Sequence, residues 1–259
     1  MVKGINSAVI IGAGNVAWHL GRALKKVNID IRQIAGKREE PAARLAEELE
    51  TDYIPDIKKI TDTADLYILA VSDDAIKSVI NILTPTEQLF VHTAGSIPLS
   101  VFENRFKNYG VFYPLQTFSR DRKVSFGDIP VCIEASSEIN SDRLMQLAGL
   151  LSRKKLLINS QERATLHLAA VFASNFTNHM YAVAYKILKE QNLDFTLLQP
   201  LIKETASKIL EMEPRIAQTG PAVRNNTSLM EFHMRMLQND KLLQDLYKTI
   251  SNNIRRYAQ

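Results

Sequence analysis

Residues 8–17 read Ala-Val-Ile-Ile-Gly-Ala-Gly-Asn-Val-Ala, and the rest of the chain is organised around this stretch. The apolar run predicts a buried strand, which breaks into a Gly-x-Gly-x-x-Ala turn and then into a helix pattern. In such a turn Gly12 permits the tight bend, Gly14 lets backbone N–H groups approach a pyrophosphate, and the small Ala17 allows helix and strand to pack closely. The stretch predicts a dinucleotide-binding βαβ unit, and the alternative is a chance glycine turn in a buried sheet.

The predicted helix would present its N-terminus to the pyrophosphate. Unpaired N–H groups and the positive end of the helix dipole favour an anion at that position. We therefore expect four residues of the turn to bind the cofactor, namely Gly12, Gly14, Asn15 and Val16.

The second predicted strand, residues 29–35, runs into Gly36-Lys37-Arg38. An NAD-binding domain normally carries Asp or Glu at this point, where the carboxylate holds the ribose 2′-hydroxyl. Here no carboxylate occurs before Glu39, and two cations would suit a 2′-phosphate. We therefore expect Lys37 and Arg38 to bind NADP in preference to NAD, with a solvated pair of loop charges as the alternative.

Strands and helices alternate through the first 159 residues, which predicts an α/β fold with a Rossmann-type, doubly wound, mostly parallel sheet. The further predicted strands are residues 65–71, 89–92, 110–114, 129–135 and 155–159, and the predicted helices are residues 17–27, 41–49, 75–83 and 141–151.

The carboxyl ends of the strands in such a sheet line the ligand crevice. We therefore expect the loops after two strands to bind the cofactor through Val71, Ser72, Thr93, Gly95 and Ser96. His92, just before the second loop, has two interpretations of equal weight: it faces the crevice, or it is a neutral histidine of the core. His19, on the first predicted helix, is expected to be solvated.

The alternation stops near residue 159, and the pattern is helical from there to the end. We predict a dinucleotide-binding Rossmann domain over residues 1–159 and an all-α domain for substrate and dimerisation over residues 160–259. A long helix over residues 161–190 has apolar and small residues on nearly every face, which predicts burial all round. Further helices are expected at residues 196–211, 228–237 and 240–256. The helix at residues 228–237 is expected to begin with a capping box, Ser228-x-x-Glu231.

Two polar residues interrupt the apolar part of the long helix, His167 and Asn175. Buried polar groups need a hydrogen-bond partner or a cavity. The two residues are eight positions apart, so on a regular helix they point within about 80° of each other and could face one cavity. The imidazole of His167 is the expected acid because its unperturbed pKa lies near neutrality.

Asn175 would then orient the substrate oxygen, with Tyr113 and Ser96 as partners from the sheet. No lysine occurs between Lys155 and Lys186 to serve instead. The alternative is that His167 and Asn175 only satisfy neighbours at a domain or dimer interface.

Composition limits the other possibilities. Of 259 residues, 46% are hydrophobic and 23% are charged, with a net charge of +4, which is typical of a globular protein. No basic block with interleaved aromatics supports nucleic-acid binding, and no apolar run is long enough for a membrane span. The chain has a single cysteine, Cys132, which excludes a disulfide within the chain. Residues 1–7 contain no hydrophobic leader, and the two observations together predict a cytoplasmic location. No metal site is expected.

The chain resembles a family of Rossmann-like NADP-binding proteins that carry a helical C-terminal domain of unknown function, DUF2520. The matching pieces are Gly12-Ala13-Gly14, His92–Ser96, Tyr113–Phe118, Ser174-Asn175 and Gly220–Arg224. More distantly, the layout is similar to pyrroline-5-carboxylate reductase and the β-hydroxyacid dehydrogenases, and the helical half to the C-terminal domain of 6-phosphogluconate dehydrogenase. In those enzymes a long helix brings catalytic side chains to the nicotinamide, and the molecule is a dimer.

The resemblance implies NADP as cofactor and a homodimer formed through the helical domain. One position departs from the β-hydroxyacid dehydrogenases. Where they have a lysine four residues before the helix asparagine, this chain has Val171, so the role of that lysine does not carry over.

The expected function is hydride transfer between NADP(H) and a small, anionic carbonyl, imine or alcohol. The alternative is a non-catalytic NADP(H)-binding sensor or regulatory protein, which would need no proton donor near the nicotinamide. A methyltransferase has least support, because it would leave the helical half without a role.

Overall fold

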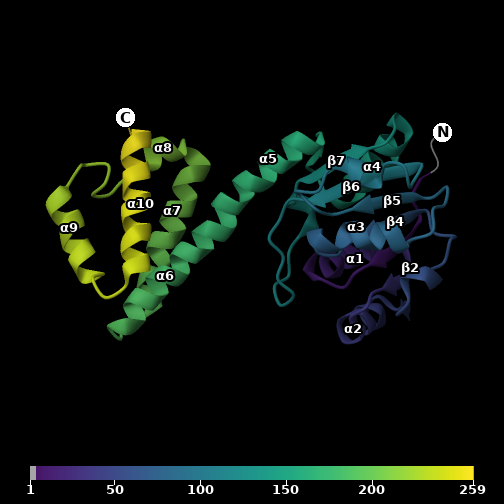
Figure 1. Ribbon diagram of the computed structural model, residues 1–259, viewed down its shortest axis with the longest axis horizontal. Coiled ribbons are helices and arrows are strands. Elements are labelled where there is room, and N and C mark those ends of the chain that lie inside the picture. Colours follow the sequence, from purple (N-terminus) through teal and green to yellow (C-terminus); the bar gives the residue numbers. More distant parts are fainter. Residues whose placement is uncertain (1–3, 259) are drawn as a thin grey trace. The chain divides into compact units, whose positions relative to one another are not determined.

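The computed structural model describes residues 4–258, and the N-terminal half is built on one eight-stranded sheet (Figure 1). The strand order is β3-β2-β1-β4-β5-β6-β7-β8, and only β6 and β7 pair antiparallel. The strands are β1 (Ser7–Ile11), β2 (Asp30–Ala35), β3 (Asp52–Ile54), β4 (Leu66–Leu69), β5 (Leu89–His92), β6 (Asn108–Pro114), β7 (Val131–Ala135) and β8 (Lys155–Leu157). The predicted doubly wound, mostly parallel sheet is confirmed.

Four α-helices connect these strands, namely α1 (Asn15–Lys26), α2 (Glu39–Leu49), α3 (Asp73–Ile82) and α4 (Glu138–Leu151). Short 3₁₀ turns lie at η1 (Ile57–Lys59), η2 (Leu99–Phe102) and η3 (Phe126–Asp128). Successive residues of β1 point to opposite faces of the sheet: Ile10 packs with α1, α2 and α4, whereas Val9 and Ile11 pack with α3. Because both faces are buried, β1 is apolar without alternation.

The strand order reverses between β1 and β4. From β1 the chain moves outward to β2 and β3, and after β4 it moves outward in the other direction. Such a reversal leaves a crevice beyond the carboxyl ends of the two central strands. Gly12 follows β1 and Ser72 follows β4, so the predicted cofactor-binding loops lie at this crevice.

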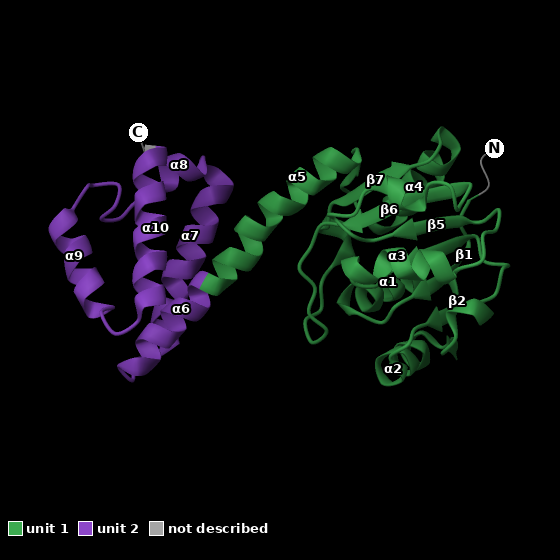
Figure 2. Cartoon of the chain, in the orientation of Figure 1, with its two compact units in different colours: residues 1–179 green, residues 180–259 purple. Residues whose placement is uncertain are grey.

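The C-terminal half is helical, as predicted. It contains α5 (Ser160–Ala170), a π-helical turn η4 (Val171–Phe176), α6 (Thr177–Glu190), η5 (Phe195–Leu198), α7 (Gln199–Glu211), α8 (Pro214–Ala217), α9 (Thr227–Met236) and α10 (Lys241–Ala258). Two compact units can be distinguished, residues 1–179 and 180–259 (Figure 2). The predicted boundary after residue 159 coincides with the start of α5, where Asn159 and Glu162 form a capping box; the extent of each domain stays a prediction.

Two local predictions in the helical half are wrong. The cap of α9 is Asn226 rather than Ser228, because the Asn226 side chain accepts a hydrogen bond from the N–H of Leu229 while Ser228 donates to Asn226. The long helix is not buried all round within one chain, since the side chains of Phe172 and Phe176 are 61% and 49% exposed. A helix that is apolar on every face needs neighbours on every side, and a single chain does not supply them here.

No helix in the part of the chain that the structure describes combines the length and the apolar character needed to cross a membrane.

Candidate active site

The glycine turn after β1 can hold only glycine at its first position. Gly12 has a φ of +113°, and a Cβ there would lie 2.3 Å from the carbonyl oxygen of Ala70, just after β4. The Gly12 N–H donates to the carbonyl oxygen of Ala35 at 2.7 Å. The turn is therefore clamped between the ends of β2 and β4, which fixes where α1 begins.

Gly14 is different, because a Cβ on it would meet no protein atom within 4 Å. It is the N-cap of α1, no side chain caps this helix, and the first turn contains no acidic residue. The N–H groups at the start of α1, including those of Asn15 and Val16, therefore have no capping side chain and lie at the positive end of a helix dipole. This arrangement fits a phosphate group.

Lys37 and Arg38 lie between β2 and α2, and both side chains are exposed. The Tyr53 hydroxyl donates a hydrogen bond to the carbonyl oxygen of Gly36 at 3.0 Å, which fixes the backbone before the two cations. Arg38 is the N-cap of α2, so both residues sit at the positive end of that helix.

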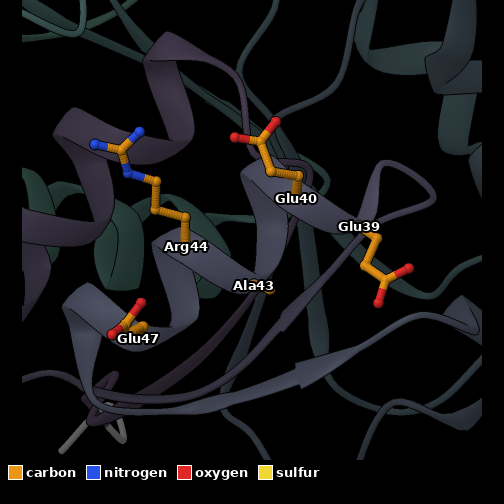
Figure 3. Close-up of a pocket in the computed structure, with 5 residues that line it drawn as sticks. All are labelled: Glu39, Glu40, Ala43, Arg44 and Glu47. Carbon is orange, nitrogen blue, oxygen red and sulfur yellow. The ribbon is translucent and has the colours of Figure 1, made fainter.

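The outer side of α2 carries a shallow hollow lined by Glu39, Glu40, Ala43, Arg44 and Glu47 (Figure 3). All five residues come from one helix, and Figure 3 shows their charged side chains pointing in different directions. The hollow has none of the converging groups of a binding site.

Tyr113 and His167 meet at the carboxyl end of β6. The Tyr113 hydroxyl lies 3.1 Å from Nδ1 of His167, and the two rings stand edge to face at 6.0 Å. Gly95 makes the approach possible, because a Cβ there would lie 2.6 Å from Nδ1 of His167. The structure therefore brings together three of the predicted site residues, from β6, from α5 and from the loop after β5.

Tyr113 is buried, and its environment keeps the phenol neutral. Burial, together with the nearby Cys132 thiol and Asp73 carboxylate, raises the pKa of Tyr113 to about 12. At neutral pH the hydroxyl is a hydrogen-bond donor and not a phenolate. Burial also raises the pKa of the Cys132 thiol, which lies on β7 in the same apolar cluster.

The remaining predicted residues of the crevice lie on the loops after β4 and β5. Ser96 donates a hydrogen bond to the carboxylate of Asp73, the first residue of α3. Ser72 is the N-cap of α3, and Val71 packs beneath Gly12. Thr93 is buried, and its N–H donates to the carbonyl oxygen of Leu69. Asp73 was not anticipated as part of the site.

Asn175 is not joined to this group. It lies on η4, its side chain is exposed, and it forms no hydrogen bond with the described residues. Its role as the group that orients the substrate stays a prediction.

Arg163 anchors α5 to the sheet, and nothing in the sequence pattern singled it out. Its fully buried guanidinium forms an ion pair with Glu134 of β7 and donates to the carbonyl oxygen of Ile97 at 2.5 Å. Ser160 donates to the same carboxylate at 2.8 Å. His167 follows Arg163 by four residues and so lies on the same helix face, which means that these contacts set where the imidazole stands.

His92 belongs to the core. It is fully buried, it stacks on Phe102 at 5.7 Å, and Nδ1 accepts the Ala94 N–H at 3.2 Å. Burial, reinforced by the positive charge of Arg163, lowers the pKa of His92 to about 3. The interpretation as a neutral core histidine is therefore the correct one.

His19 is also buried, contrary to the expectation of a solvated residue. Residues from the segment after β6 cover it: Phe118 stacks on the ring at 4.8 Å, and the carbonyl oxygen of Ser119 lies 3.0 Å from Nε2. Because this covering segment is a hundred residues away in the chain, local periodicity could not reveal it.

Comparison with known proteins identifies the family to which the chain belongs. Residues 7–94 match the family described as NADP oxidoreductase coenzyme F420-dependent, and residues 129–254 match the domain of unknown function DUF2520. The crystal structure of the putative NADP oxidoreductase BF3122 from Bacteroides fragilis is 43% identical, with a TM-score of 0.91 over 97% of this chain and 98% of that chain. The chain belongs to this NADP oxidoreductase family with a DUF2520 domain. The resemblance inferred from the sequence motifs is confirmed.

More distant structures share the fold of this NADP oxidoreductase family. Protein TM1727 from Thermotoga maritima is 24% identical, with a TM-score of 0.72 over 97% of this chain and 98% of that chain. The imine reductase from Myxococcus stipitatus, in complex with NADP⁺, is 13% identical, with a TM-score of 0.70 over 96% of this chain and 93% of that chain. A comparison with curated proteins gave no match.

In this chain, the N-terminal match contains the glycine turn, and the DUF2520 match contains α5 with His167. Among residues 4–258 no group of three or more His, Cys, Asp or Glu side chains could hold a metal ion.

Proposed function

We propose that this protein is an NADP(H)-dependent oxidoreductase acting on a small carbonyl, imine or alcohol. The observation that carries the proposal is the Tyr113–His167 pair, 3.1 Å apart at the carboxyl end of a strand in the sheet that also carries the glycine turn. The cofactor, when bound, supplies or accepts a hydride at its nicotinamide ring. The open Gly14 turn and the uncapped start of α1 would hold its diphosphate.

His167 and Tyr113 would divide the proton chemistry between them. Charge develops on the substrate heteroatom during hydride transfer, so a proton donor and a hydrogen-bond donor both accelerate the step. A phenol whose pKa is about 12 is a weak acid at neutral pH, so Tyr113 would donate a hydrogen bond. His167 would exchange the proton, because an imidazole nitrogen can act as a general acid or base within hydrogen-bond reach of the reacting atom. Ser96 and Asn175 are further candidates for orienting the substrate.

Replacing His167 by glutamine, or Tyr113 by phenylalanine, is expected to reduce turnover about a hundredfold while leaving NADPH affinity within about twofold of wild type. The measurement is NADPH oxidation against a panel of anionic and neutral carbonyls and imines, alongside a binding titration. Wild-type turnover that survives both substitutions would contradict these roles. If the wild type binds NADPH but turns over no member of the panel, a non-catalytic NADP(H) sensor becomes the better proposal.

Removing both Lys37 and Arg38 is expected to weaken NADPH binding about tenfold or more and to leave NADH binding unchanged, because only NADPH carries the 2′-phosphate. Calorimetric titration of the Lys37→Ala/Arg38→Ala variant with both cofactors measures this. Lys26→Ala is the matched control, since it removes an exposed cation at the opposite end of α1. Equal losses of affinity for NADPH and NADH would show that Lys37 and Arg38 do not recognise the 2′-phosphate.

The proposal includes a homodimer formed through the helical half. Among the described residues from 180 onward, Ala222 is the one apolar residue that is buried. Large apolar side chains stay exposed on several helices, for example Phe172 (61%), Leu201 (62%), Leu210 (86%) and Leu242 (82%). Covering this apolar surface with a second copy would stabilise both chains. A cytoplasmic location is also proposed, supported by the single, buried thiol of Cys132.

We expect sedimentation to show a dimer at micromolar concentration and the Phe172→Glu/Leu210→Glu variant to be a monomer. A charge placed in a buried apolar interface cannot be solvated, so association fails. The control is Ile139→Glu, which places the same charge at an apolar residue of α4 that is 64% exposed. A wild-type monomer would contradict the proposal.

A further inference from the structure

The segment between β6 and η3, residues 115–125, folds back onto the start of α1 (Figure 1). Three consecutive residues of it contact the first turns of that helix or the glycine turn itself. The contacts are a hydrogen bond from Nδ2 of Asn15 to the carbonyl oxygen of Phe118 at 2.8 Å, the 3.0 Å approach of His19 Nε2 to the carbonyl oxygen of Ser119, and a hydrogen bond from Nη2 of Arg120 to the carbonyl oxygen of Ala13 at 3.0 Å.

The guanidinium of Arg120 is held in one place by this geometry. It stacks over the Trp18 ring, 4.6 Å from the ring centroid, and cation–π contacts of this kind order an arginine side chain. Ala13 lies between the two glycines, so the charge stands beside the backbone that would meet the cofactor phosphates. The single hydrogen bond to Ala13 occupies one of the five N–H donors of the group.

A second arginine, Arg22, also lies over the Trp18 ring, but its charge is paired with a carboxylate. Arg22 lies 5.3 Å from the Trp18 centroid, but it forms an ion pair with Glu48 of α2. Among the described residues no carboxylate forms an ion pair with Arg120. Its positive charge is therefore ordered beside a phosphate-binding turn and is not neutralised by the protein.

We propose that Arg120, in the segment after β6, is a phosphate-recognition residue of the cofactor site and that its guanidinium binds the cofactor diphosphate. The inference rests on the proposed function, because it takes the cofactor to be a dinucleotide. A guanidinium matches phosphate geometry and forms charge-assisted hydrogen bonds to it. The diphosphate would then be held from two sides, by backbone N–H groups of α1 and by the Arg120 side chain, which is 107 positions from Ala13 in the sequence. The contacts of the Phe118 and Ser119 carbonyl oxygens with α1 hold the segment in place, so that the Arg120 side chain stands beside the glycine turn.

The test compares Arg120→Met with Arg22→Met, two variants that remove a guanidinium from the same indole ring. NADPH and NADH are titrated calorimetrically into each, and thermal unfolding confirms that each is folded. Trp18 is the single tryptophan, so its emission reports that the ring environment has changed in both variants. We expect Arg120→Met to bind both cofactors about tenfold more weakly and Arg22→Met to bind them within about twofold of wild type. Arg120→Lys, which keeps the charge, should recover part of the affinity.

Each other outcome is decisive. Equal affinities for the two methionine variants would overturn the role of Arg120 while leaving the proposed function intact. A loss confined to NADPH would overturn recognition of the diphosphate, because both cofactors contain one and only NADPH carries the 2′-phosphate. If wild type binds neither cofactor, the proposed function itself fails, and this inference fails with it.

Discussion

Replacing Arg163 by methionine is expected to lower the free energy of unfolding by about 3 kcal/mol, because the Glu134 carboxylate is left without its partner in a largely buried position. The side chains of Arg163 and Glu134 are 1% and 17% exposed. Urea unfolding of wild type and variant measures the change. The double variant Arg163→Met/Glu134→Leu should recover part of the loss, since no unpaired charge then remains.

The matched control for this prediction is Arg153→Met. Arg153 also forms an ion pair, in its case with Asp128, but the two side chains are 75% and 69% exposed. Solvent screens such a pair, so its loss should cost at most about 1 kcal/mol. Equal destabilisation in the two variants would show that Arg163 does not anchor α5. A genuine loss of the anchor should also lower turnover, because His167 lies on the same face of that helix.

Substituting alanine at the two glycines of the turn should give opposite outcomes. Gly12→Ala is expected to destabilise the fold by about 4 kcal/mol, because its Cβ would lie 2.3 Å from a backbone oxygen at a φ of +113°. Gly14→Ala should leave the urea midpoint nearly unchanged, since a Cβ there meets no protein atom within 4 Å. Its methyl group would instead occupy the space of a phosphate.

NADPH affinity of Gly14→Ala is therefore expected to fall tenfold or more. Gly4→Ala is a suitable control, because a Cβ there also meets no protein atom within 4 Å and Gly4 lies before β1, outside the turn. Normal NADPH binding by Gly14→Ala would mean that no phosphate approaches this backbone. A stable Gly12→Ala variant would show that the turn can rearrange.

Local sequence patterns were sufficient to predict the sheet and part of the site. The apolar run before Gly12 and the alternation after it reflect burial on both faces of a parallel sheet, which is a repeating local constraint. Tyr113, Ser96 and Gly95 could be found because carboxyl ends of neighbouring parallel strands share one edge of the sheet. His167 stood out as a polar residue in an apolar helix, and the structure places it beside Tyr113.

Contacts between distant residues could not be predicted in this way. Arg163 and Glu134 are separated by 29 positions, and each alone reads as a solvated charge. His19 and Arg120 depend on the path of a segment a hundred residues from α1. Asn226 and Ser228 are equally suitable N-cap residues, and the helix is capped two residues earlier than predicted. The local sequence does not distinguish between them.

The π turn η4 changes the angular phase of the long helix. A π turn holds one residue more than an α-helical turn, so the eight positions from His167 to Asn175 correspond to about seven regular steps. The two side chains then differ by about 20° in direction instead of about 80°, with roughly 11 Å between them along the axis. The extra residue thus aligns the two polar groups on one side of the helix. An insertion or deletion within residues 171–176, rather than a substitution, is the change that would separate them.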